Sequence, residues 1–108
     1  MSTEKLYLVT RADLSAGQRA VQVAHALRAF VESHPDVDRE WYQNSNYLAL
    51  LEVPGEPQLA RLLEKAQSRG LPASGFREPD RENELTAIAL GPGAKKICRG
   101  LPLALRCT

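Results

Sequence analysis

Two polar side chains interrupt an alanine-rich, apolar run in RADLSAGQRAVQVAHALRAF, residues 11–30. Gln22 and His25 are three residues apart, so on a helix they lie on one face and could contact a common ligand. In a plainer interpretation, Gln22 donates to a backbone carbonyl at a sheet edge and His25 is half-buried and hydrogen-bonded, as buried amides and imidazoles usually are. The helix alone does not separate these two interpretations.

The residues before this face form a candidate anion site. DLSAGQR, residues 13–19, places Gly17 where the backbone N–H groups of a starting helix lack partners, with Arg19 inside the first turn. A phosphate could bind there. Because every helix has such an end, this signal alone is not specific.

A second polar cluster lies in FREPDREN, residues 76–83, between two expected strands. Its candidate acids are Glu78 and Asp80. If those strands pair beside the first strand, this loop and the loop after Thr10 open at the same sheet edge. On composition alone, a solvated turn is at least as good an interpretation.

The elements that must position these groups follow from hydrophobic patterning. KLYLVT (5–10), NYLALLEV (46–53) and ELTAIALGP (84–92) predict buried strands, and PASGF (72–76) predicts an edge strand weakened by glycine. We expect the last two strands to be antiparallel, because their connection is short. The first two should be parallel, because a helix connects them.

The first helix is expected to begin near Ser15, which is a good N-cap, to continue to about Ser33, and to end before Pro35. Its predicted apolar stripe has spacings of three and four and consists of Val21, Ala24, Leu27, Phe30 and Val31.

Two further helices complete the pattern, one between Pro57 and Gly70 and a short one over about residues 93–99. The resulting order of elements predicts an α/β domain with a mixed sheet and helices packed on its faces.

Length and composition limit the number of domains and the kinds of partner. The 108 residues suit one domain, residues 1–108, and the net charge of +1 argues against a protein that coats nucleic acid indiscriminately. Residues 91–108 contain four bases and no acid, a pattern more often solvated than binding. The apolar runs are too short for a membrane span or a signal peptide, so we expect a cytoplasmic protein that makes no membrane contact.

Cys98 and Cys107 are expected to be reduced thiols, and neither has a nearby Cys or His at metal-ligand spacing. Trp41, Tyr42 and Tyr47 are expected to pack in the core. A homodimer interface is the other possibility for these aromatics, and the sequence does not decide it.

Taken in order, several motifs resemble the type 2 peptidyl-tRNA hydrolase family over about residues 5–105. They are R-x-D-L at 11–14, Q-x-x-H-A at 22–26, LEVPGEPQLARLLEKAQSRGLPASGFRE at 51–78, and L-T-x-I-A-L-G-P at 85–92. The resemblance implies a three-layer α/β/α fold around a mixed four-stranded sheet. It also implies hydrolysis of the ester between a peptide and tRNA, with no metal or organic cofactor. In this resemblance, Gly91 and Pro92 match a strand end that borders the site.

The chain departs from the family pattern at two places. SAGQR is shorter than the usual glycine- and lysine-rich loop, with Gln18 at the position of a functionally important lysine and Arg19 beside it. REPDREN, residues 77–83, is also shorter than the family's loop and supplies Glu78 or Asp80 as the acid. The second departure resembles the divergent branch called peptidyl-tRNA hydrolase domain-containing proteins.

Ester hydrolysis requires a positioned water, a proton acceptor and donors to the oxyanion. We expect Asp80, or failing that Glu78, to orient or deprotonate the water. Gln18 and Gln22 would face the oxyanion, and His25 would tune or orient. The tRNA phosphates would bind basic residues: Arg11, Arg19, Lys95 and Lys96.

Two other functions stay open. The same cleft could bind a tRNA or protein partner without catalysis, and the fold could serve a small-molecule or protein-interaction domain, because fold does not determine function.

Overall fold

The structure is a computed structural model that describes residues 4–106, so the expectation for Cys107 lies outside the described residues. Four strands form one mixed sheet in the order β2-β1-β4-β3. Strand β1 (Lys5–Arg11) pairs in parallel with β2 (Tyr47–Val53) and antiparallel with β4 (Glu84–Leu90). Strand β3 (Ala73–Glu78) pairs antiparallel with β4 at the edge. The predicted strands and pairings are confirmed.

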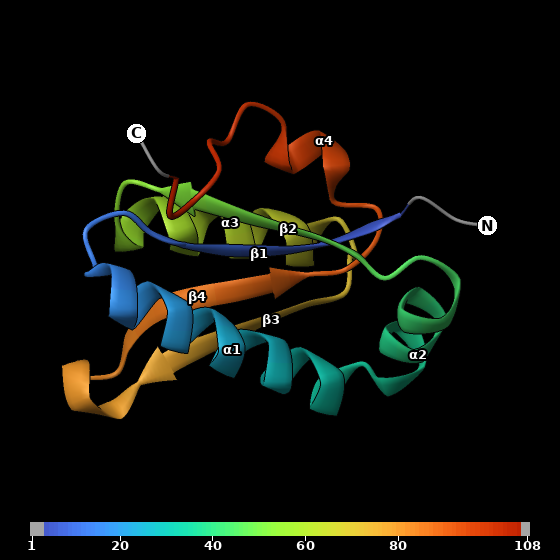
Figure 1. The fold of residues 1–108 in the computed structure, drawn as a ribbon, viewed down its shortest axis with the longest axis horizontal. Helices are drawn as coiled ribbons and strands as arrows, with labels where there is room; N and C mark the ends of the chain where they lie inside the picture. Colours follow the sequence, from blue (N-terminus) through green and yellow to red (C-terminus); the bar gives the residue numbers. More distant parts are fainter. Residues whose placement is uncertain (1–3, 107–108) are drawn as a thin grey trace.

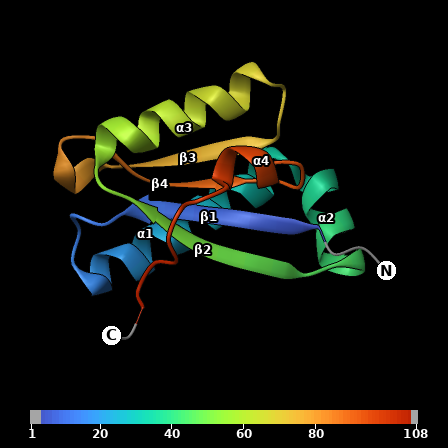
Figure 2. The ribbon, with the colours of Figure 1, turned by 90° about the horizontal axis from the view of Figure 1, so that it is seen from above.

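Helices cover both faces of this sheet, as the α/β/α prediction requires (Figures 1 and 2). Helix α1 (Ala16–Ser33) lies on one face, and α3 (Glu56–Ser68) with the short α4 (Lys95–Cys98) lies on the other. A 3-10 turn, η1 (Pro79–Arg81), connects β3 to β4. Within residues 4–106, no helix has the length and hydrophobicity needed to cross a bilayer.

The sequence prediction missed one helix, α2 (Pro35–Asn44). Pro35 was expected only to end the first helix, but it also occupies the first turn of α2, where a missing N–H costs nothing. Trp41 on α2 is buried, as expected, and its Nε1 donates to the Tyr47 carbonyl at 2.7 Å. The core prediction is wrong for Tyr42 and Tyr47, which are 65% and 52% exposed.

The predicted apolar stripe of α1 is only partly correct: Phe30 is fully buried and Leu27 packs against the core, but two other members are not buried. Val21 is 54% exposed and Ala24 is exposed, whereas the residues facing the sheet are Gln22, Val23, Ala26 and Phe30. Both sets have helical spacing, so periodicity alone could not choose between them. The sheet selects the set that includes Gln22 because it offers that amide a polar partner, described below.

The core has two layers, one on each side of the sheet. On the α1 side, Leu6 and Leu8 of β1 pack with Phe30 and with two alanines of β4, Ala87 and Ala89. On the other side, buried strand residues pack under α3 and α4 in the larger cluster, which includes Val9, Val53, Leu59, Ile88 and Cys98. Successive residues of β1 alternate between these layers, as the pleat requires.

Candidate functional site

Three segments meet at one end of the sheet, where the strands terminate: the end of β1, the start of α1 and the β3–β4 connection (Figure 1). The antiparallel register pairs Thr10 with Ala87, which brings the first residues of β4 beside the last residues of β1. The loops that were expected to share an edge therefore do so.

A chain of hydrogen bonds crosses this edge. The Thr10 hydroxyl donates to the Thr86 carbonyl at 2.9 Å, and the Thr86 hydroxyl donates to Gln22 Oε1 at 2.6 Å. Gln22 Nε2 in turn donates to Glu78 Oε1 at 3.1 Å. Gln22 is only 5% exposed, so this chain fixes its amide with the NH₂ group toward Glu78.

The sequence reasoning did not assign Thr86 to the site. Thr86 is fully buried and its side chain is the one hydroxyl within LTAIAL, residues 85–90. A polar side chain in an otherwise aliphatic strand needs a buried partner, and that requirement was the available signal.

An open pocket of about 420 Å³ lies beside this series of hydrogen bonds. Its walls come from the first turns of α1, from the end of β3 and from the β3–β4 connection. The lining residues are Gly17, Gln18, Val21, Gln22, Glu78, Asp80 and Arg81. The pocket thus joins the helix start, the buried amide and both candidate acids.

The two acids differ in position. Glu78 hydrogen-bonds to Gln22, whereas Asp80 lines the pocket from η1. The expected order of preference placed Asp80 first, and the geometry favours Glu78 because it contacts the polar face of α1 directly.

Gln18 is held at the helix start by a capping box. Its backbone N–H donates to Ser15 Oγ at 3.2 Å, and its side-chain oxygen accepts from the Ser15 N–H at 3.1 Å. Ser15 is therefore the N-cap, as predicted. The reciprocal bonds fix the Gln18 side chain at the rim of the pocket.

His25 is exposed and stacks on Phe76 of β3, with ring centroids 4.4 Å apart and planes at 14°. Gln22 and His25, predicted to share a helix face, both contact β3 residues. One is nearly fully buried and the other is exposed.

Arg11 was expected to contact tRNA, but its guanidinium is occupied inside the protein. It makes two hydrogen bonds to Asp13, both at 2.9 Å, and further bonds to Glu84 at 2.8 Å and to the Leu85 carbonyl at 3.2 Å. Arg11 is 5% exposed. The hydrogen bonds from Arg11 lower the pKa of Asp13 and of Glu84. The same bonds raise the pKa of Arg11, and the bonds to Asp13 have the largest effect. Arg11 therefore ties the β1–α1 loop to the start of β4.

The other expected tRNA contacts are separated in space. Arg19 donates to the Leu14 carbonyl and to Glu52, both at 3.0 Å, and lines a different pocket of about 470 Å³ that also includes Arg106. Lys95 and Lys96 begin α4, on the opposite face of the sheet from α1 (Figure 2). The structure does not bring these lysines to Arg19.

Gly91 and Pro92 do not border the pocket, contrary to the expectation. A Cβ on Gly91 would lie 3.1 Å from Phe30 and from Pro72, near the carboxyl end of α1. The reason is the strand direction: β4 begins near the pocket and runs antiparallel to β1, so the last residues of β4 lie at the opposite end of the sheet.

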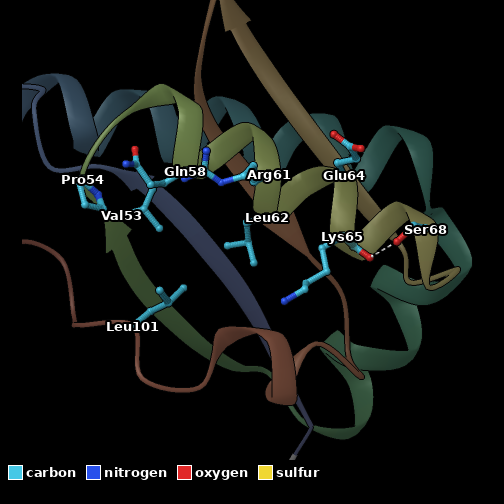
Figure 3. Close-up of a pocket in the computed structure, with 9 residues that line it drawn as sticks. All are labelled: Val53, Pro54, Gln58, Arg61, Leu62, Glu64, Lys65, Ser68 and Leu101. Carbon is cyan, nitrogen blue, oxygen red and sulfur yellow. Dashed lines mark hydrogen bonds between the residues drawn. The ribbon is translucent and has the colours of Figure 1, made fainter.

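A larger pocket of about 710 Å³ lies on the α3 side of the sheet. Figure 3 shows Leu62 and Lys65 of α3 pointing toward the space between α3 and Leu101. None of the residues expected to do chemistry line it, so its size does not make it the candidate active site. Among residues 4–106, no three His, Cys, Asp or Glu side chains are grouped so that they could hold a metal ion.

Fold and site together define a three-layer α/β domain with a polar pocket at one end of its sheet, where a buried amide contacts a carboxylate. A sequence profile of the family described as Peptidyl-tRNA hydrolase PTH2 matches residues 4–106, and the chain belongs to this family.

Individual relatives agree with this assignment. The chain is 31% identical to a peptidyl-tRNA hydrolase of Methanocaldococcus jannaschii, in an alignment that covers 82% of this chain and 85% of the relative. It is also similar in fold to a solved structure of a protein of unknown function from Agrobacterium tumefaciens. That structure has a TM-score of 0.70 and 17% identity, and the match covers 95% of this chain and 98% of the other.

Proposed function

We propose that this protein hydrolyses the ester between a peptide and the terminal ribose of tRNA in the cytoplasm, within the divergent branch of the family. The observation that carries the proposal is the Gln22–Glu78 hydrogen bond at the base of an open pocket beside the start of α1. The shortened loop over residues 77–83 supports placement in that branch.

In the proposed reaction, Glu78 orients a water molecule and accepts its proton as the water oxygen bonds to the carbonyl carbon of the ester. The tetrahedral intermediate then collapses, and the bond to the ribose oxygen breaks. That oxygen takes the proton from Glu78. The products are a peptide with a free carboxyl group and a tRNA with a free hydroxyl group.

The oxyanion needs donors that are already in place. Gln22 Nε2 has a second N–H besides the one bonded to Glu78. The backbone N–H of Gly17 lies in the first turn of α1, where intrahelical acceptors are absent. A Cβ at Gly17 would meet no atom within 4 Å, so a ligand has room to approach this backbone.

Arg81 is the cation that lines this pocket, and we assign the nearest phosphate contact to it. Its Nε lies 3.4 Å from Glu84, a partly exposed pairing that a phosphate could replace. Arg19, Lys95 and Lys96 enter the proposal only as contacts to more distant parts of the tRNA.

The test is release of a labelled N-acetylated amino acid from charged tRNA by purified protein. We expect Glu78→Gln to lower the rate by about 100-fold or more, because a positioned acid–base group contributes roughly that factor. Asp80→Asn should lower it less. The control is Glu32→Gln, since Glu32 lies on the exposed side of α1 and pairs with Arg28. Release by the wild type at the protein-free rate would refute the proposal.

The alternative is a module that binds tRNA or a protein without catalysis. It is favoured by the state of residues 18 and 19: Gln18 is neutral and stands in the capping box, and Arg19 is paired with Glu52, so neither supplies a free cation to the pocket. Binding of tRNA that weakens as salt rises, without any release of the acetylated amino acid, would support this alternative.

A further inference from the structure

The His25–Phe76 pair presents a flat aromatic surface beside the pocket. The rings are nearly parallel, with centroids 4.4 Å apart and planes at 14°. Because Phe76 covers one face of the imidazole and the His25 side chain is exposed, the other face is turned toward solvent. Phe76 packs against the α1-side core, so it holds the imidazole from below.

This surface is continuous with the candidate active site. Gln22 and His25 of α1 contact Glu78 and Phe76 of β3 respectively, so the stacked rings lie one helical turn from the amide–carboxylate pair. Figure 1 shows β3 running alongside α1 over this stretch. Val21 is 54% exposed, lines the pocket and precedes His25 by four residues, which places it on the same outer side of the helix.

The chemistry of this surface suits a nucleobase. A planar base gains affinity by stacking on an aromatic ring, and such stacking is a common way for proteins to hold unpaired bases. The ester under attack is attached to the ribose of the terminal nucleotide, so the base of that nucleotide must lie within one sugar of the reacting carbon. A ring one helical turn from Glu78 is at a suitable distance.

We propose that the exposed face of His25, supported by Phe76, stacks with the terminal base of the tRNA and so positions the ester over Gln22 and Glu78. This inference rests on the proposed function. It assigns His25 a binding role that does not require a proton transfer.

The test uses an uncharged RNA minihelix that ends in the tRNA acceptor sequence and carries 2-aminopurine as its terminal base. The emission of 2-aminopurine falls when it stacks, so titration with wild-type protein should quench it. Variant His25→Phe keeps a stacking face and should preserve the quenching. Variant His25→Leu removes that face and should weaken binding by about 5- to 100-fold, the range measured for single base–aromatic contacts.

Tyr42→Leu is the matched control, because Tyr42 is also an exposed aromatic residue but lies on α2, away from the pocket (Figure 1). Its loss should leave the titration unchanged. The proposal is overturned if the wild type does not quench the probe, or if His25→Leu binds within two-fold of the wild type.

A different outcome would indicate that the His25 imidazole contacts the peptide instead of the base. If hydrolysis discriminates acetyl-phenylalanyl-tRNA from acetyl-alanyl-tRNA only while His25 is present, and the quenching is unaffected by His25→Leu, the base-stacking proposal is overturned. Because the probe RNA carries no ester, quenching reports on this inference and ester release reports on the proposed function. The two can therefore fail separately.

Discussion

Replacing Thr86 with valine removes one hydroxyl at almost constant volume, in the middle of the hydrogen-bond chain. That hydroxyl donates to Gln22 Oε1 at 2.6 Å, and Gln22 is 5% exposed, so water has little access to the orphaned oxygen. Leaving a buried acceptor unsatisfied costs about 1–3 kcal/mol. For a chain of 108 residues, with an unfolding entropy near 2.1 cal/mol/K per residue, this cost corresponds to a fall in Tm of roughly 4–13 °C.

The assay is thermal unfolding followed by circular dichroism, with urea unfolding at 25 °C as a second measure. Thr86→Ser keeps the donor and should lose less stability than the valine variant. The double variant Gln22→Leu with Thr86→Val removes both partners, so it should be more stable than the sum of the single effects predicts. A Tm for Thr86→Val within 2 °C of the wild type, or strictly additive effects in the double variant, would refute the claim that this bond fixes the Gln22 amide.

Three further predictions concern the rest of the fold. The pKa of Asp13 is lowered in the folded protein, mainly by its hydrogen bonds from Arg11, so the resulting stability is present above the ordinary carboxyl pKa and is lost as the pH falls through the lowered value. Unfolding free energy measured between about pH 5 and pH 2 should therefore fall more steeply for the wild type than for Arg11→Met, and equal slopes would contradict this. Burial raises the pKa of the Cys98 thiol to about 11, so in a Cys107→Ser background it should react with a thiol reagent at pH 8 far more slowly when folded than in urea; equal rates would be the contrary result. A Cβ on Gly75 would lie 2.9 Å from Leu85, so Gly75→Ala should destabilise the protein by about 1–3 kcal/mol in urea unfolding, and an unchanged midpoint would show that the side chains around it yield freely.

The predictions from the sequence failed in part at two places: the segment after Pro35 and the apolar stripe of α1. Proline stops a preceding helix and starts a following one equally well, so Pro35 alone could not reveal α2. Two sets of residues on α1 have helical spacing, and the set that is buried includes a glutamine. Hydrophobicity ranks that glutamine as a surface residue, and only the presence of Thr86 and Glu78 makes its burial favourable.

The order of the strands and of the helices other than α2, the parallel and antiparallel pairings and the Ser15 cap were determined by the sequence, because each depends on local patterning or on the length of a connection. Tertiary structure alone decided which polar groups share the pocket. Glu78 contacts Gln22, Arg11 is buried in ion pairs, and Lys95 lies on the other face of the sheet. These placements follow from the strand topology, which determines which residues that are distant in sequence lie at the same end of the sheet. Local periodicity holds no information about that choice.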